Sequence, residues 1–79
     1  INKDAEVVLY ATSWCKYCRK ARNLLKDNDI HYVEYDIEKS SEGLSSYNKI
    51  GGKGIPVLVI NGTVIHGFNA DKILNTLRQ

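Results

Sequence analysis

The alternation of strand and helix patterns over residues 6–36 constrains the fold of this chain more than any other feature. Residues 6–11 form a short apolar run with β-branched side chains, which predicts a buried strand. Apolar side chains then recur at helical spacing over residues 15–28, and residues 31–36 again have the pattern of a strand. Two strands joined by one helix form a βαβ unit, in which the strands lie parallel and the crossover is right-handed.

A second helix is expected after this unit. Ser40 and Ser41 are candidates for its N-cap, because hydroxyl side chains accept hydrogen bonds from the free N–H groups at a helix start. The glycine pair at residues 51–52 is expected to end the helix. Its inner side is expected to carry Leu44, Tyr47 and Ile50.

The last part of the chain has the pattern of a hairpin followed by a helix. Residues 56–60 read as a strand, and the Asn61-Gly62 pair is a strong signal for a tight turn into an antiparallel strand at residues 63–66. Residues 70–79 predict the last helix. The expected order is β-α-β-α-β-β-α, in a single α/β domain made of all 79 residues.

Composition excludes several classes of protein. The net charge of +2 is too small to indicate a nucleic-acid-binding surface, and no apolar run approaches the roughly 18 residues that span a membrane. The two cysteines are too few for a small protein held together by disulfides. We therefore expect a monomeric, cytoplasmic protein that binds neither nucleic acid nor membranes. Its first residue is Ile1, as expected for an excised domain or a processed chain.

The two cysteines, Cys15 and Cys18, stand where the first predicted strand gives way to the first helix. Residues at this spacing lie on one face of a helical turn, close enough for a disulfide. The first cysteine is at the helix N-terminus, where free N–H groups and the helix dipole favour an anion, and Lys16 and Arg19 add positive charge. These features favour the thiolate, so Cys15 is expected to attack a substrate disulfide and Cys18 to resolve the product.

The cysteine pair is a poor match for three less reactive roles. A permanent disulfide would close a very small loop and stabilise little. Two buried, inert cysteines are disfavoured by the position at a helix start. A zinc site could add His31, but no fourth ligand follows it at the spacing of a zinc finger, so no bound metal is expected.

The residues near the two cysteines could serve either the packing of the fold or the binding of a ligand. Trp14 is expected to form a flat wall beside the reactive sulfur, and Tyr17 is expected either to pack in the core or to line a ligand site. A run of basic residues follows, which is typical of a solvated helix face but could also attract acidic partners. The run consists of Lys16, Arg19, Lys20 and Arg22.

Three motifs in order now identify a family. A strand followed by Trp14-Cys15-x-x-Cys18, the Gly54-Ile55-Pro56 strand start and a Gly-Phe turn at residues 67–68 together resemble the glutaredoxin family of the thioredoxin fold. The resemblance covers nearly the whole chain. It implies a four-stranded mixed sheet flanked by three helices and a thiol–disulfide oxidoreductase that reduces protein disulfides or glutathione mixed disulfides.

The resemblance also implies roles for individual residues. Cys15 would be the nucleophile and Cys18 the resolving thiol, glutathione would be the co-substrate, and the Ile55–Pro56 bond would be cis. The Ile55 backbone would pair with a bound peptide or glutathione. The residues implied in substrate and glutathione binding are Trp14, Lys16, Tyr17, Ile55, Pro56, Gly67, Phe68 and Asn69.

The chain departs from the family pattern in three places. Lys16 replaces the usual proline between the cysteines, no lysine occurs in residues 10–13, and Asp71 stands one place late, with Ala70 where an aspartate is usual. We expect weaker glutathione binding as a result. The Gly-Phe-x-x-Asp pattern resembles redoxins that take electrons from thioredoxin reductase, which keeps either glutathione or that reductase open as the donor. Two alternatives remain: a glutathione-ligated [2Fe–2S] module and an inactive peptide-binding module.

Overall fold

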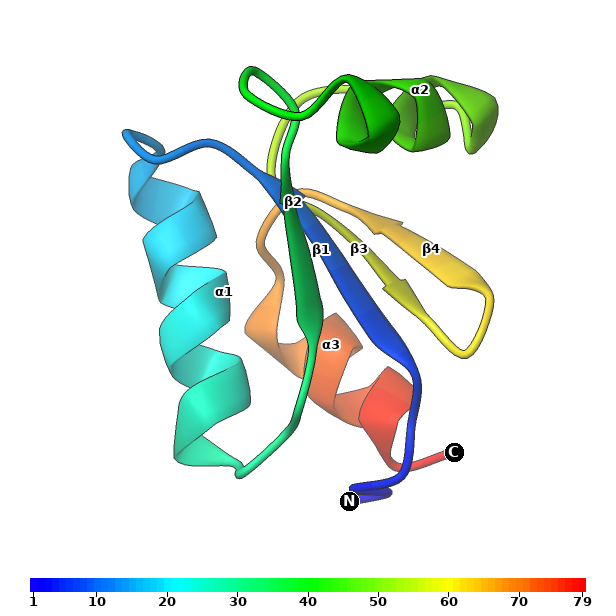
Figure 1. Cartoon of the computed structure of the whole chain (residues 1–79). Coiled ribbons are helices and arrows are strands. Elements are labelled where there is room, and N and C mark those ends of the chain that lie inside the picture. The colour runs from blue at the N-terminus through cyan, green and yellow to red at the C-terminus, as the bar shows by residue number, and fades with distance from the viewer.

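The computed structural model describes all 79 residues, which form one four-stranded sheet with three helices. The sheet order is β2-β1-β3-β4, with β1 parallel to β2 and antiparallel to β3, and β3 antiparallel to β4 (Figure 1). The predicted order and the mixed sheet are therefore confirmed. The elements are β1 (Val7–Ala11), α1 (Lys16–Asp27), β2 (Val33–Asp36), α2 (Ser41–Lys49), β3 (Val57–Ile60), β4 (Thr63–His66) and α3 (Ala70–Leu77).

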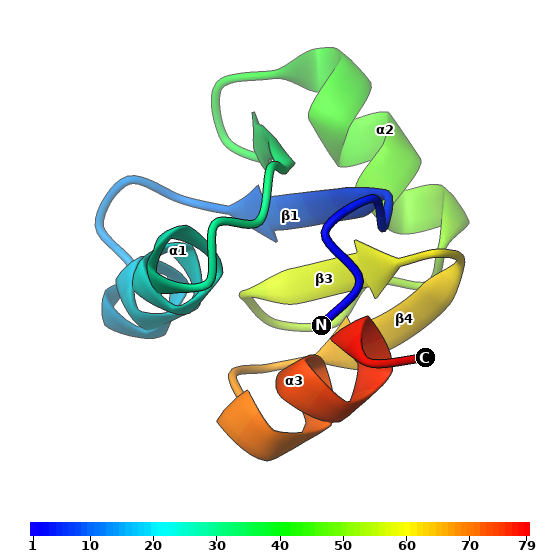
Figure 2. The same ribbon diagram turned by 90° about the horizontal axis from the view of Figure 1, so that it is seen from below.

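The helices cover the two faces of the sheet unequally. Helices α1 and α3 lie on one face and α2 lies on the other (Figure 2). Between the sheet and α1 and α3 is a cluster of 14 buried residues, whereas the cluster on the α2 face has only three. Both termini lie at the end of the molecule opposite the loop that joins β1 to α1 (Figure 1). None of the three helices has the length and apolar sequence needed to cross a membrane.

The ends of the elements follow the local signals in the sequence. Ser40 caps α2, with its Oγ accepting a hydrogen bond from the Gly43 N–H at 2.9 Å. Asn61 and Gly62 both have positive φ angles, of 48° and 85°, which suits the tight turn between β3 and β4. The elements are shorter than the patterns predicted: β2 begins at Val33 rather than residue 31, and α3 ends at Leu77.

The prediction that Leu44 lies on the inner side of α2 is wrong. Leu44 is 42% exposed, whereas Gly43 and Tyr47 are buried. The reason is a close approach: a Cβ on Gly43 would lie 2.7 Å from the Tyr35 Cβ. The helix therefore turns its glycine toward the sheet, which rotates Leu44 outward and leaves Ile50 half-buried at the C-cap.

Candidate active site

Cys15 is the N-cap residue of α1. Its backbone is extended, with φ −77° and ψ 118°, and its Sγ accepts a hydrogen bond from the Cys18 N–H at 3.2 Å. The sulfur thus occupies the place that a serine or aspartate oxygen usually takes at a helix start. No acidic residue lies in the first turn of α1, so the dipole of the helix acts on the sulfur without a competing anion. This geometry places the Cys15 sulfur at the positive end of the helix dipole.

Cys18 lies one turn into α1 and is completely buried, whereas Cys15 retains 7% exposure. Burial and the hydrogen bond with Cys15 raise the pKa of the Cys18 thiol to about 12, while the Thr12 backbone and the Arg22 charge act in the opposite direction. Both cysteines are free thiols in this structure. Both cysteines are thus buried, Cys18 completely and Cys15 nearly so, and the raised pKa keeps the Cys18 thiol protonated at neutral pH.

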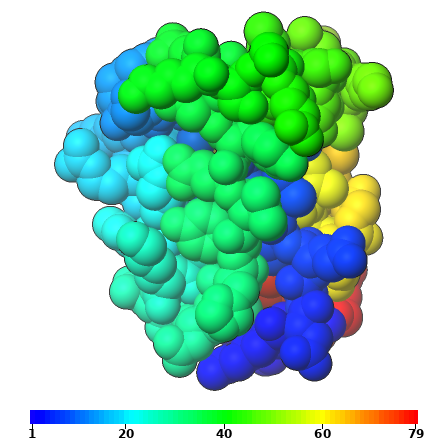
Figure 3. All heavy atoms as spheres, viewed as in Figure 1, coloured from blue at the N-terminus to red at the C-terminus, as the bar shows by residue number.

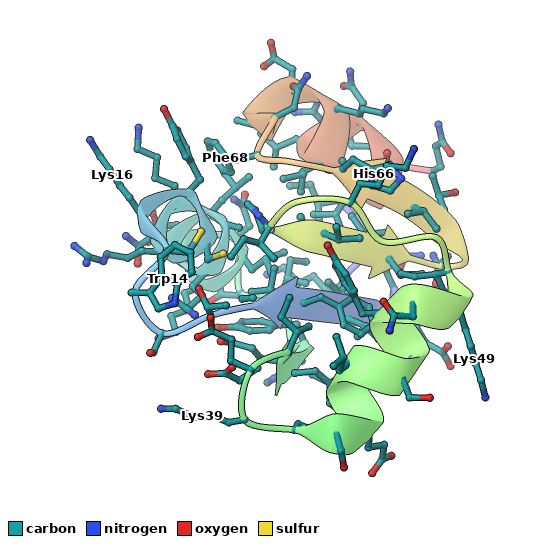
Figure 4. All side chains as sticks on the ribbon, turned by 90° about the horizontal axis from the view of Figure 1, so that it is seen from above. Trp14, Lys16, Lys39, Lys49, His66 and Phe68 are labelled. Atoms are coloured by element: carbon teal, nitrogen blue, oxygen red, sulfur yellow. The ribbon has the colours of Figure 1, made fainter.

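Trp14 lies beside the two sulfur atoms at the start of α1 (Figure 4). Its side chain is 66% exposed, and its Nε1 donates a hydrogen bond to Glu38 Oε1 at 2.9 Å. Glu38 follows β2 and is far from Trp14 in the sequence, so no local pattern points to this contact. The indole ring is held on the surface next to the thiols.

The core-packing alternative for Tyr17 is wrong. Tyr17 is 55% exposed, because the buried stripe of α1 runs through Cys18, Ala21 and Leu25. Its ring lies on the surface under the Lys20 ammonium, with Nζ 5.3 Å from the ring centroid. Lys16 points away from the molecule into solvent (Figure 4). Tyr17 is thus available at the surface of the site.

The loop before β3 contains the cis Ile55–Pro56 bond that the family resemblance predicted. Two hydrogen bonds hold this loop: Tyr47 Oη donates to the Gly54 carbonyl at 2.7 Å, and the Gly67 N–H donates to the Pro56 carbonyl at 2.8 Å. By contrast, the backbone N–H and C=O of Ile55 have no hydrogen-bond partner within the chain. A segment of another molecule could pair with them as an added strand.

The loop between β4 and α3 completes this end of the molecule. Phe68 is half-buried and packs against the cluster that includes Cys15 and Cys18. Gly67 has a φ of 81°, which a residue with a side chain rarely adopts. Asn69 caps α3, with its Oδ1 accepting a hydrogen bond from the Lys72 N–H at 3.0 Å.

The molecule has two shallow cavities, of about 330 and 410 Å³, and neither touches the thiols. Both adjoin His31 and Tyr32, where β2 starts, whereas the thiols follow the carboxyl end of β1. Figure 3 shows the side of the molecule at β2, with α1 on the left and the connection to α2 above. No group of three or more histidine, cysteine, aspartate or glutamate side chains is placed to hold a metal ion.

One charged cluster behind the thiols was not expected from the sequence. Arg22, predicted to belong to a solvated basic face, makes a two-pronged ion pair with Glu34 of β2 and donates to the Thr12 carbonyl. The sequence gives little indication of this contact. Predicting it requires both the parallel register of β1 and β2 and the direction in which α1 turns each of its side chains. The remaining basic residues, Lys16, Arg19 and Lys20, are exposed as predicted.

A thiol at a helix N-cap, a buried thiol one turn later and a cis-proline loop on a mixed sheet define a thiol–disulfide oxidoreductase of the thioredoxin fold. Comparison with known proteins makes this more specific. The family model named Glutaredoxin matches residues 7–65, and the chain belongs to the glutaredoxin family. The Cys15-x-x-Cys18 centre is in keeping with this assignment.

Individual relatives agree with the family assignment. A glutaredoxin-like 8.6 kDa protein of the rubredoxin operon of Clostridium pasteurianum is 33% identical over 70 residues, which cover 85% of this chain and 91% of the relative. The crystal structure of a mutant of the thioredoxin-like protein BC3987 has a TM-score of 0.87 at 27% identity, covering 92% of this chain and 95% of that one. The glutaredoxin of Archaeoglobus fulgidus has a TM-score of 0.80 at 26% identity, with coverages of 96% and 89%.

Proposed function

We propose that this protein reduces protein disulfides and glutathione mixed disulfides, with Cys15 as nucleophile, Cys18 as resolving thiol and glutathione as electron donor. The observation that carries the proposal is the Cys15 Sγ at the N-cap of α1, where it accepts the Cys18 N–H at 3.2 Å. A sulfur in this position is stabilised as a thiolate, which is the form that attacks disulfides.

In the first step, the Cys15 thiolate attacks one sulfur of the substrate disulfide. A bond forms between Cys15 Sγ and that sulfur, the substrate S–S bond breaks, and the other sulfur leaves as a thiolate that takes up a proton from solvent. The 66% exposed Trp14 beside the sulfur offers a flat apolar surface to the incoming group.

In the second step, Cys18 loses its proton and attacks Cys15 Sγ. The Cys15–Cys18 disulfide forms, the mixed disulfide breaks, and the second substrate thiolate leaves. Two glutathione molecules then reduce the protein disulfide and are themselves oxidised to one glutathione disulfide. The spacing of the cysteines, one helical turn apart, suits the Cα separation that a disulfide needs.

Substrate docking is proposed at the Ile55 backbone. Its unpartnered N–H and C=O can form a short antiparallel pairing with the backbone of a peptide or of glutathione. Tyr17 and Phe68 are proposed to line the flanks of the bound segment, since one is exposed and the other half-buried near the thiols. This pairing contacts the substrate backbone and not its side chains, so the protein is expected to accept disulfides of varied sequence.

Glutathione is proposed to bind more weakly than in relatives with a full set of charged contacts. No lysine occurs in residues 10–13, and the Ala70 side chain has no acceptor. A hydrogen bond to a charged group contributes about 1.5–3 kcal/mol, so two missing bonds weaken binding on the order of a hundredfold or more.

A reduction assay with two electron donors tests the proposal. The substrate is a glutathionylated protein, and the donors are glutathione with its reductase and thioredoxin reductase alone. Activity with glutathione that disappears in Cys15→Ser is expected. Activity with thioredoxin reductase only would contradict the choice of donor, and activity that survives Cys15→Ser would contradict the role of Cys15.

A visible absorption spectrum of the purified protein separates the enzyme from the iron–sulfur alternative. A colourless protein that reduces disulfides is the expected result. Absorption that is lost when Cys15 is replaced would instead identify a glutathione-ligated [2Fe–2S] module.

A further inference from the structure

We propose that Arg22 is a positioning residue that stabilises the Cys18 thiolate during the resolving step, and that Glu34 and the Thr12 carbonyl hold its guanidinium in place. The proposal rests on the proposed function in one respect, namely that Cys18 is the resolving thiol. Cys18 is completely buried and must ionise before it can attack. A buried thiolate needs a nearby positive charge.

Arg22 lies four residues after Cys18 in α1, so the two side chains share one face of the helix. Helical side chains lean toward the helix N-terminus, which brings the guanidinium back toward the thiols. The contact with Thr12 shows that it reaches this end, because Arg22 Nη2 donates to the Thr12 carbonyl at 3.0 Å. Thr12 stands directly after β1 and is itself buried.

Glu34 fixes the guanidinium from the other side. Arg22 Nε donates to Oε1 at 2.8 Å and to Oε2 at 3.0 Å, and Nη2 donates to Oε2 at 2.7 Å. The two side chains are only 20% and 30% exposed, so solvent screens them less than a pair on the open surface. Glu34 thus has two opposing effects: it holds the cation in place, and its negative charge offsets part of the cation's field.

Few other charges face Cys18. The elements packed around it contribute apolar side chains, apart from the buried Thr12 hydroxyl, the Tyr32 phenol and the ion pair itself. Burial and Cys15 raise the pKa of Cys18, while the Thr12 backbone and Arg22 lower it. The apolar neighbours in this cluster include Leu9 and Ala11 of β1, Leu58 of β3 and Ile73 of α3.

Formation of the mixed disulfide changes this balance. Once Cys15 is bonded to the substrate sulfur, it no longer carries a thiolate, and its opposition to ionisation of Cys18 is removed. Burial, the largest cause of the raised pKa of Cys18, still opposes ionisation. The lowering effects of Arg22 and the Thr12 backbone remain. Cys18 can then release its proton to solvent and attack Cys15 Sγ, forming the Cys15–Cys18 bond and expelling the substrate thiolate. Arg22 therefore acts at the stage where Cys18 must ionise.

A reaction with 2,2′-dipyridyl disulfide measures the two steps separately. This neutral reagent releases one thiopyridone when Cys15 attacks and a second when Cys18 resolves the mixed disulfide, and both releases are followed by absorbance in a stopped-flow instrument. Cys18→Ser should give the first release only. The rate of each phase is measured against pH for the wild type and for Arg22→Gln, Arg22→Lys and Glu34→Gln, with Lys26→Gln as the control for an exposed charge in the last turn of the same helix.

The expected result is a pair of opposite changes in the second phase. Arg22→Gln should slow it on the order of tenfold at neutral pH and displace its pH profile to higher pH, while Glu34→Gln should speed it. Arg22→Lys, which keeps the charge, should restore most of the rate, and Lys26→Gln should change nothing. A purely structural ion pair would make both Arg22→Gln and Glu34→Gln shift the second phase in the same direction, and that result would overturn the proposal.

Two further outcomes are also decisive. If Arg22→Gln does not fold, the test uses the Glu34→Gln variant only, which keeps the Arg22 charge and its contact with Thr12. A second phase that is unchanged or slower in Glu34→Gln than in the wild type then overturns the proposal. If the first phase is missing at neutral pH, the role of Cys15 in the proposed function fails. The mixed disulfide is then loaded at alkaline pH, and the second phase is measured after return to neutral pH.

Discussion

The two faces of the sheet differ in both the thickness and the chemistry of their cores. The face under α1 and α3 has 14 buried residues, nearly all aliphatic, with the two cysteines among them (Figure 2). The α2 face has three, and two of these are tyrosines, Tyr10 and Tyr47. The Tyr10 ring stacks on Tyr35 at 5.8 Å and meets Tyr47 at 5.9 Å, measured between centroids.

The two faces of the sheet support different parts of the site. The aliphatic face holds α1 firmly, and with it the sulfur at the helix start. The aromatic face holds the cis-proline loop by polar contacts, because Tyr47 Oη donates to the Gly54 carbonyl next to Ile55. Gly52 must be a glycine for this, since a Cβ there would lie 2.5 Å from the Tyr47 ring. The two thiols are thus held by packing, and the cis-proline loop by hydrogen bonds.

Truncation of two neighbouring residues of β3 compares the faces directly. Leu58 and Val57 are both completely buried, one on each face. Leu58→Ala should cost about 2–5 kcal/mol of the free energy of unfolding, because the surrounding aliphatic side chains cannot fill the cavity. Val57→Ala should cost about 1–2 kcal/mol. Urea unfolding measures both, and a cost for Val57→Ala larger than that for Leu58→Ala would contradict the difference between the faces.

Alkaline pH should destabilise the reduced protein through the aliphatic face. The pKa of Cys18 is about 12 in the folded protein and about 9.0 without burial, so the stability it contributes is complete below pH 9 and is lost as the pH rises toward 12. The loss should reach roughly 1.5 kcal/mol between pH 9 and 10.5.

Urea unfolding in a reducing buffer, compared between the wild type and Cys18→Ala, isolates this effect. Tyr32, whose pKa burial also raises, is present in both proteins and cancels in the difference. The stability difference between the two proteins should change with pH over this range. A constant difference would show that Cys18 does not titrate as described.

Loss of one hydroxyl should affect the aromatic face least. Tyr47→Phe removes the hydrogen bond to the Gly54 carbonyl and should cost about 0.5–1.5 kcal/mol. It should also slow disulfide reduction, because the loop that carries Ile55 loses an anchor. The matched control is Tyr10→Phe, which loses a 2.6 Å hydrogen bond to Ser46 on the same face without touching the loop. Equal rates of disulfide reduction in the two variants would show that the Tyr47 hydrogen bond to the loop does not affect activity.

Local signals in the sequence were sufficient for much of the fold. The Asn61-Gly62 turn, the Ser40 cap and the helix start at Cys15 each depend on residues close together in the chain, and all three are confirmed. The cis bond before Pro56 could not be predicted from local preference and followed only from the family resemblance.

Contacts between distant segments escaped prediction. The phase of α2 depends on Gly43 against Tyr35, and the ion pair of Arg22 with Glu34 depends on how α1 lies over β2. The same is true of the hydrogen bond from Trp14 to Glu38. Each of these needs two elements in place, so the spacing of residues within either element carries no signal for it.

The most direct test of the account compares the reactivity of the two cysteines at neutral pH. The reduced protein is treated briefly with a limiting amount of iodoacetamide, and the modified residue is identified by peptide mass spectrometry, with a free cysteine peptide as reference. Cys15 should react faster than the reference peptide, and Cys18 should stay unmodified because it is buried and protonated. Modification of Cys18 first, or a Cys15 that reacts no faster than the reference, would contradict the account.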